Sequence, residues 1–224
     1  MKVLTIKQAR FIALFDVDEL MPLGLTPMSK IVPTIASRFE FQGFTTPNNG
    51  QDKDSSKGFE FSDGIWDGTP VPRLAIFNDG IIVETRISTS RSREIFTESM
   101  DWAKRELGLK VGEDILRRLR FLSILTLQSK APLLNPSVAI SNAADRMAAA
   151  MEAITGRERE YSGIRIDIDF DRSADKESIA GLTIQTLALE PFQSNRYFSQ
   201  APLPTDEHIA LLEQYETDVL AARS

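Results

Sequence analysis

Two aspartates at the end of a predicted strand are the residues best placed to do chemistry in this sequence. They lie in Phe15-Asp16-Val17-Asp18-Glu19, which follows an apolar run and precedes a predicted helix. Side chains two apart on a strand point to the same side, so Asp16 and Asp18 can share a divalent metal ion such as Mg²⁺. The alternative is a strand that ends among solvated acids.

The same stretch has a short resemblance to a known family. Phe11-Ile-Ala-Leu-Phe-Asp-Val-Asp18 resembles the first catalytic strand of palm-type nucleotide cyclases and polymerases. Paired acids in that family hold two metal ions for phosphoryl transfer. The resemblance therefore implies a Mg-dependent nucleotide cyclase or nucleotidyltransferase that uses Asp16 and Asp18, and this is our second hypothesis. It covers roughly ten residues, and no glycine-rich phosphate loop accompanies it.

The residue types that other catalytic sites need are scarce. The chain of 224 residues has no cysteine, which excludes a thiol nucleophile, a disulfide and a Cys-zinc site. The single histidine, His208, follows Pro204-Thr-Asp-Glu at a predicted helix start, and we expect an exposed helix histidine there. Without a complete catalytic constellation, the leading hypothesis is a non-catalytic protein that needs no cofactor.

The charge balance argues against nucleic acid as the partner. The net charge is -6 and the isoelectric point is about 5.0, and an acidic surface repels phosphate backbones. A local basic cluster nevertheless contains Arg117, Arg118 and Arg120, with Lys104, Arg105 and Lys110 before it. Nucleic-acid binding through this cluster is our third hypothesis.

The start of the chain and its apolar runs predict a cytoplasmic protein. Residues 1–10 lack the apolar centre of a signal peptide. No apolar run reaches the ~20 residues that a membrane helix needs. We therefore expect no membrane association.

Internal similarity predicts the fold class. Arg10-Phe-Ile-Ala-Leu-Phe15 matches Arg120-Phe-Leu-Ser-Ile-Leu125 at an offset of 110 residues, and similar elements follow each segment. Strands are predicted near 10–15, 58–61, 73–77, 81–86, 120–125, 163–170 and 181–185, and helices near 27–40, 91–107, 136–154 and 206–222. The prediction is an α+β protein of two pseudo-equivalent β-α-β-β-β-α halves, 1–109 and 110–224, in one compact unit. Its sheet is mostly antiparallel, with the helices on one face.

Entry signals and small residues single out the helix near 136–154. Asn135-Pro136 matches Thr26-Pro27 in the first half, and both read as an N-cap residue followed by proline. The run Met147-Ala-Ala-Ala-Met151 allows another backbone to approach closely. We expect a tightly packed core helix, and a seam between two copies of the chain is the alternative.

The other sheet face and one strand edge are the predicted contact surfaces. Alternation places Arg165, Asp167, Asp169 and Asp171 on a face open to water, together with Glu60. A metal site on the three aspartates is the alternative. Trp66 lies in a turn-rich segment, as either a binding anchor or a cap on the core. Ile81 and Val83 lie on a predicted edge strand that no proline guards, so pairing with another copy is expected. The alternative is that the other half of the same chain covers this edge. The leading hypothesis is therefore a protein-binding or scaffold component of a homo- or hetero-oligomeric cytosolic assembly.

Overall fold

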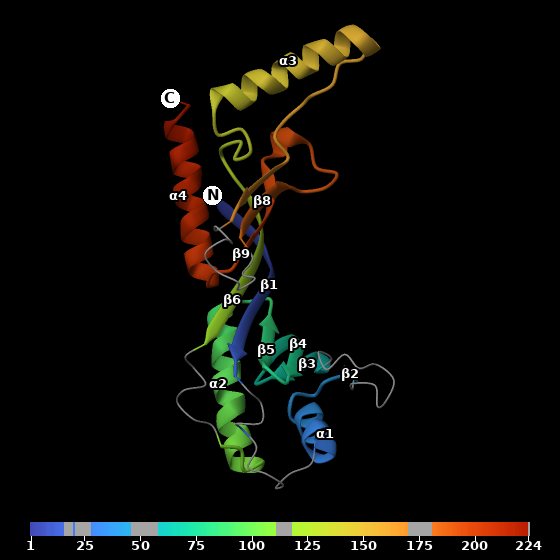
Figure 1. Cartoon of the computed structure of the whole chain (residues 1–224), viewed down its shortest axis with the longest axis vertical. Helices are drawn as coiled ribbons and strands as arrows, with labels where there is room; N and C mark the ends of the chain where they lie inside the picture. The colour runs from blue at the N-terminus through green and yellow to red at the C-terminus, as the bar shows by residue number, and fades with distance from the viewer. Residues whose placement is uncertain (16–19, 21–27, 46–57, 111–117, 170–180, 224) are drawn as a thin grey trace. The chain divides into compact units, whose positions relative to one another are not determined.

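The computed structural model shows an α+β protein, as the element pattern predicts (Figure 1). It describes residues 1–15, 20, 28–45, 58–110, 118–169 and 181–223. The strands are β1 (Lys2–Leu14), β2 (Gly43–Thr45), β3 (Phe59–Trp66), β4 (Thr69–Phe77), β5 (Gly80–Thr85), β6 (Leu119–Gln128), β7 (Arg165–Ile168), β8 (Leu182–Thr186) and β9 (Arg196–Ala201). The helices are α1 (Met28–Arg38), α2 (Thr89–Glu106), α3 (Val138–Thr155) and α4 (Thr205–Ala221), with a short 3₁₀ turn at Phe192–Ser194.

The strands form one antiparallel sheet in the order β2-β3-β4-β5-β1-β6-β9-β8-β7. The second half of the chain has the predicted element order, β6-α3-β7-β8-β9-α4, apart from the short 3₁₀ turn. The first half has the same order with one additional short strand, β2. Superposition of the two halves, and with it the internal duplication, stays a prediction.

The chain packs into two compact units, and β1 and β6 contribute to both. The unit that we call the N-unit contains Gln8–Ser123 and Leu203–Thr205. The C-unit contains Met1–Lys7, Ile124–Pro202 and Asp206–Ser224. Each unit has its own apolar core, so each is described separately below.

In the N-unit, α1 and α2 pack on the same face of the strands. Apolar side chains at every second position, from Phe11 of β1 to Phe15 just after the strand, meet residues of β4 and β5 in one buried cluster. Ile31 and Ile35 of α1 and Ile95 of α2 belong to the same cluster. The one-sided helix arrangement predicted from the sequence therefore holds for these two helices.

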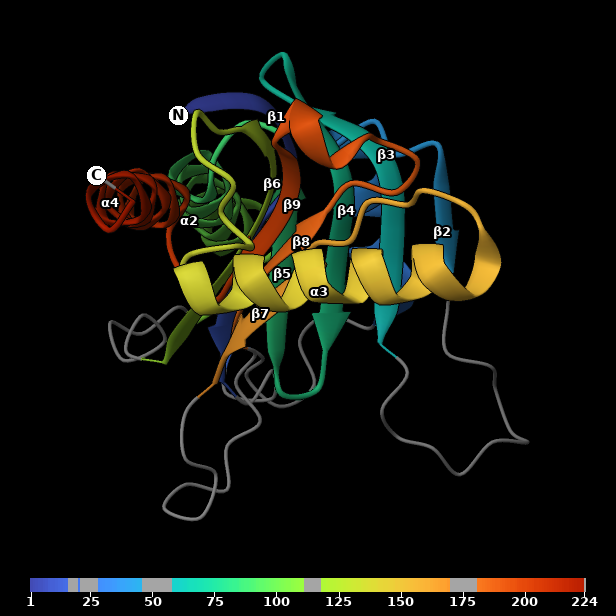
Figure 2. The ribbon, with the colours of Figure 1, turned by 90° about the horizontal axis from the view of Figure 1, so that it is seen from above.

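In the C-unit, α4 covers one face of the strands. Leu212 and Val219 of α4 are buried with Leu125 of β6, Ile184 of β8 and Tyr197 of β9. Figure 2 shows α4 nearly end-on, while α3 runs across the view. Of the two α-helices that the structure describes in this unit, α4 places side chains in the core and α3 does not.

Local signals in the sequence account for both ends of α2 and for the hairpin between β4 and β5. The Ser88 side chain caps α2 by accepting a hydrogen bond from the Arg91 N–H at 3.0 Å, and Gly108 follows the helix with a φ of 68°. Asp79-Gly80 between two apolar runs favours a hairpin, and one is present, because Phe77 of β4 pairs with Gly80 of β5. Such signals act within a few residues, which is why the sequence alone locates them.

The predicted edge strand lies inside the sheet. β5 pairs with β4 on one side and with β1 on the other, so its backbone groups are already bonded within the chain. Ile81 and Val83 point into the core of the N-unit, and Val83 is 0% exposed. The prediction that this strand pairs with another copy is therefore wrong. A strand that is apolar on successive residues suits a central position better than an edge.

Candidate protein-binding surface

The third helix carries an apolar stripe that its own unit does not bury. None of the side chains of α3 is buried, so the expected core helix is wrong. Ile154 is 77% exposed and Met147 is 48% exposed. The stripe contains Ile140, Ala144, Met147, Met151 and Ile154, and we call it the α3 seam. Its residues recur at intervals of four and three, the spacing with which one helix packs along another.

Caps at both ends define this helix. The Ser137 side chain is the N-cap and accepts a hydrogen bond from the Ile140 N–H at 3.4 Å. Gly156 ends the helix in the left-handed conformation, with a φ of 65°. The N-cap of α3 is therefore Ser137, two residues after the predicted Asn135, because the serine that follows Pro136 accepts the capping hydrogen bond.

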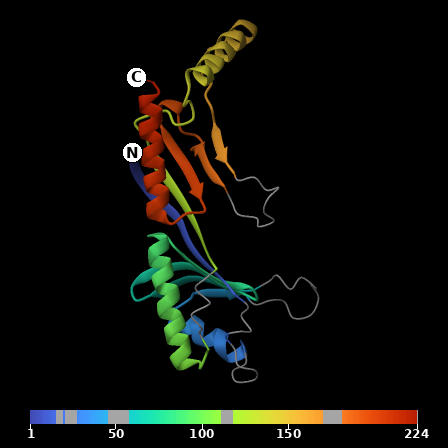
Figure 3. The same cartoon turned by 60° about the vertical axis from the view of Figure 1, so that its left-hand side comes forward.

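Asn135 instead ties the segment before α3 to the strand region of the C-unit. Its Oδ1 accepts a hydrogen bond from the Gly163 N–H at 3.1 Å, and its Nδ2 donates to Ser162 at 3.0 Å. Arg223, beyond the end of α4, donates to the Asn135 carbonyl and to Ser141 Oγ, both at 3.0 Å. The first turn of α3 is thus held in place, and Figures 1 and 3 show the helix beyond the ends of the strands of its unit.

A polar pocket of about 300 Å³ lies beside this anchor in the C-unit. Polar groups in its lining bond to one another, as Asn135 does with Ser162 and as Tyr197 does with Asn195 at 3.1 Å. Glu160 likewise accepts a hydrogen bond from Gln193 Nε2, which also lines the pocket. The polar groups of the lining thus bond to one another and hold the segment before α3 in place. They do not indicate which kind of ligand the pocket would bind.

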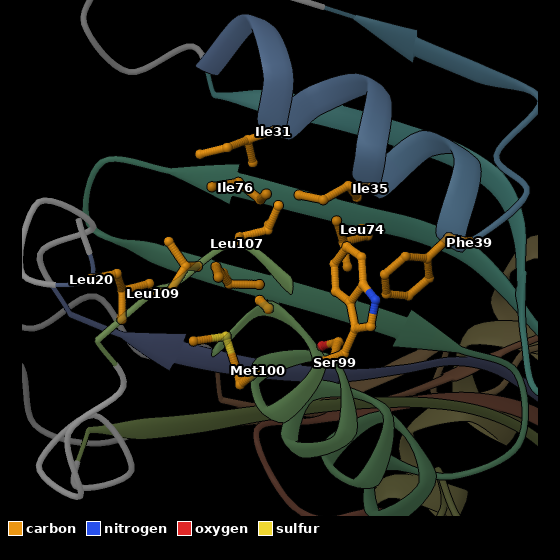
Figure 4. Close-up of a pocket in the computed structure, with 13 residues that line it drawn as sticks. Leu20, Ile31, Ile35, Phe39, Leu74, Ile76, Ser99, Met100, Leu107 and Leu109 are labelled. Atoms are coloured by element: carbon orange, nitrogen blue, oxygen red, sulfur yellow. The ribbon is translucent and has the colours of Figure 1, made fainter. Parts of the chain in front are cut away.

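An apolar pocket of about 60 Å³ lies in the N-unit between α1, the sheet and α2 (Figure 4). Ile31, Ile35 and Phe39 of α1 line it together with Leu74 and Ile76 of β4. Sites for small molecules enclose roughly 300–1,000 Å³. The volume here is that of a packing gap in the core.

The indole of Trp66 is part of the N-unit core and does not form a surface anchor. Its side chain is 2% exposed, and its ring centroid lies 4.5 Å from that of Phe39. Trp66 Nε1 donates to Glu98 of α2 at 2.6 Å, and the guanidinium of Arg38 lies 3.9 Å from the ring centroid. The core alternative for Trp66 therefore agrees with the structure, whereas an exposed anchor does not.

The histidine expected at the surface is fully buried. His208 is 0% exposed, and its Nε2 lies 2.9 Å from Ser199 Oγ, which is also buried. Ser199 donates its single hydroxyl hydrogen to the Thr183 carbonyl at 3.0 Å, so it accepts from the Nε2–H of His208. A histidine that activates serine must accept that hydrogen instead. The pair therefore serves packing, and burial lowers the pKa of His208 to about 4.

Charged residues of the sheet pair with one another in both units. In the N-unit, Arg73 donates to Glu60 at 2.6 Å and Arg10 donates to Glu84 at 2.8 Å. In the C-unit, Asp167 is exposed, and hydrogen bonds from Thr183 and then Arg165 hold its pKa below the usual 3.8. Asp169 is also exposed, as expected, and Asp171 lies outside the described residues. This pattern is typical of a solvated sheet surface.

The remaining predicted site residues are only partly described. Asp16, Asp18 and Arg117 lie outside the described residues, so their positions cannot be compared with the predictions. Arg118 is exposed, and Arg120 is half-buried on β6 with its guanidinium donating to the Leu119 carbonyl at 3.2 Å. Within the described ranges, no group of three or more His, Cys, Asp or Glu side chains is placed to hold a metal ion.

The α3 seam is therefore the candidate protein-binding surface among the residues that the structure describes. The chain matches no protein-family model and no curated protein sequence. Among the helices that the structure describes, none is long and apolar enough to cross a membrane. The seam was visible in the sequence as the spacing from Ile140 to Ile154, but this spacing does not say whether the partner belongs to the same chain.

Proposed function

We propose that this protein is a non-catalytic, protein-binding component of an assembly and that α3 is the element through which it docks. The observation that carries the proposal is a capped helix whose apolar stripe has no buried residue. Contiguous apolar surface in contact with water is unfavourable, and on proteins it marks interaction sites. A helix with preformed ends loses little conformational freedom on binding, which favours its use for docking.

The position of the charged residues of α3 supports a protein partner. Asp145, Arg146 and Glu152 are its charged residues, and helical geometry places them away from the seam. The core of a protein interface is depleted in charge, whereas its rim is polar. The seam and its surroundings have this distribution.

Site-specific crosslinking tests the proposal. A photo-reactive amino acid replaces Met147 in the seam, and the matched control replaces Ala149, which lies on the opposite side of α3. We expect a discrete protein adduct from position 147 in cell extract or in the purified protein, and little from position 149. Equal background crosslinking at both positions would contradict the proposal.

A further inference from the structure

We infer that the occupant of the α3 seam is a second copy of the same chain, bound as an antiparallel helix pair. The inference rests on the proposed function, because it takes α3 as the docking element and names its partner. In this pair Ile140 lies opposite Met151, Ala144 opposite Met147 and Ser137 opposite Ile154. Each contact occurs twice, since a two-fold axis relates the copies and closes the assembly at two chains.

Side-chain size favours the antiparallel direction. An antiparallel pair places a small residue against a large one in two kinds of layer, Ala144 against Met147 and Ser137 against Ile154, and only Ile140 against Met151 joins two large residues. A parallel pair would place each residue against itself. The Ala144 layer would then be hollow, while the layers of Met147 and Met151 would be crowded. The antiparallel direction also brings opposite ends of the two helix dipoles together.

The residues that flank the seam allow close approach without selecting a charged partner. They are small and uncharged, namely Ser141, Ala143, Ala148 and Ala150. Charged flanks set partner choice in helix pairs, so a foreign helix with charged flanks would find no complementary charge at the positions that flank the seam. A second α3 brings uncharged flanks of its own and desolvates no ion. The flanks therefore match best when the partner is identical.

The way α3 is anchored is compatible with this direction. Arg223 holds the first turn to its own unit through Ser141, and Figure 3 shows the later turns farther from the strands. In an antiparallel pair the two anchored ends lie at opposite ends of the seam, so the two protein bodies do not compete for space. A parallel pair would bring both bodies to the same end.

The length of α3 sets the strength of the pair. Eighteen residues give a helix about 27 Å long, and a contact strip about 10 Å wide covers far less than the roughly 800 Å² per partner of a standard interface. The association is therefore reversible and depends on concentration. It is best measured by sedimentation equilibrium of the full chain from about 1 µM to about 1 mM.

The decisive comparison uses two charge substitutions. Met147→Glu places a carboxylate in the seam, and Ala149→Glu places the same group on the opposite side of the helix. We expect wild type and Ala149→Glu to dimerise alike and Met147→Glu to associate at least about tenfold more weakly. Circular dichroism checks that both variants keep the fold, which we expect because neither side chain is buried. A monomer at every concentration, or equal association of both variants, would overturn the inference.

Introduced cysteines determine the direction of the pair, because the chain has no cysteine of its own. Ile140→Cys and Met151→Cys are oxidised separately and as a mixture. An antiparallel pair crosslinks only in the mixture, whereas a parallel pair crosslinks each variant to itself. Self-linked Ile140→Cys, or no disulfide above that of Ala149→Cys, contradicts the inference. If the chain is monomeric while position 147 still crosslinks to a different protein, the pairing fails and the proposed function stands.

Discussion

Acidification should destabilise the C-unit, because the fold buries its histidine in the neutral form. His208 is 0% exposed, and burial lowers its pKa from 6.5 to about 4. In the unfolded chain the imidazole is in water and binds a proton near its ordinary pKa. As the pH falls from 6.5 towards 4, the unfolded state binds more protons than the folded state, so stability is lost within this window. Above 6.5 it is fully present.

The size of the effect follows from the two pKa values. One pKa unit corresponds to about 1.4 kcal/mol, so a shift from 6.5 to about 4 lowers the free energy of unfolding by about 3 kcal/mol once the window has been crossed. Between about pH 7.5 and about pH 5 the expected loss is about 2 kcal/mol. That is a substantial part of the 5–15 kcal/mol or so that stabilises a typical domain.

A buried carboxylate nearby titrates in a different range. Burial raises the pKa of Glu216, but hydrogen bonds from the Met1 ammonium, the Lys130 N–H and Ser129 hold it below the usual 4.5. Its contribution is therefore present above 4.5 and is lost as the pH falls through its lower, folded-state pKa. The decline between about pH 6.5 and about pH 5 thus reports mainly on His208.

Urea denaturation with two spectroscopic probes separates the units. All three tyrosines lie in the C-unit, whereas Trp66 and Trp102 lie in the N-unit. Tyrosine signals should show the loss of stability on acidification. Tryptophan emission, excited separately, reports whether the N-unit changes as well.

Two variants make the reasoning refutable. His208→Gln cannot titrate but keeps an N–H for Ser199, so its stability should be nearly constant between about pH 7.5 and about pH 5. Ser199→Ala loses the hydrogen bond, about 1 kcal/mol, and keeps the titrating imidazole, so it should decline with pH as wild type does. An equally steep decline in His208→Gln would show that other groups cause the pH dependence.

Three further predictions concern the N-unit. Trp66→Phe should lower the free energy of unfolding by about 2 kcal/mol, because it removes the hydrogen bond to Glu98; urea denaturation followed by the remaining tryptophan measures this. Val83→Ala should cost roughly 2 kcal/mol and leave the solution mass unchanged, since β5 is internal; a change of mass at unaltered stability would refute this. Gly80→Ala should lower the free energy of unfolding by roughly 1–3 kcal/mol, and by more than Gly68→Ala does. Of these two positions, only at Gly80 would a Cβ meet a backbone oxygen of β1, at 2.2 Å. Thermal melts of the two variants compare the losses.

Much of the fold could be predicted from the sequence because its determinants are local. Apolar runs and alternation located seven of the nine strands that the structure describes, all but β2 and β9. Helical spacing located the helices, and Gly108 marks the end of α2. The hairpin at 78–80 follows from turn chemistry alone. Even the displaced start of α3 is a local matter, since Ser137 offers a cap two residues after Asn135.

Only the tertiary structure decided which elements are central and which are exposed. The sequence of β5 does not say which strands flank it, and pairing with β1 and β4 buried Val83. Trp66 is buried because α1 and α2, distant in sequence, close over its ring. His208 is buried because α4 packs its N-terminal turns against β9.

The candidate site shows the same division. The spacing from Ile140 to Ile154 determines that α3 has an apolar stripe and that a helix is a suitable partner. It does not determine whether that partner comes from the core of the same unit. The hydrophobic effect depends on the area removed from water and not on what covers it, so an apolar stripe specifies burial without specifying the partner. The tertiary structure decides this point, because the C-unit completes its core with α4 and leaves the α3 seam in contact with water.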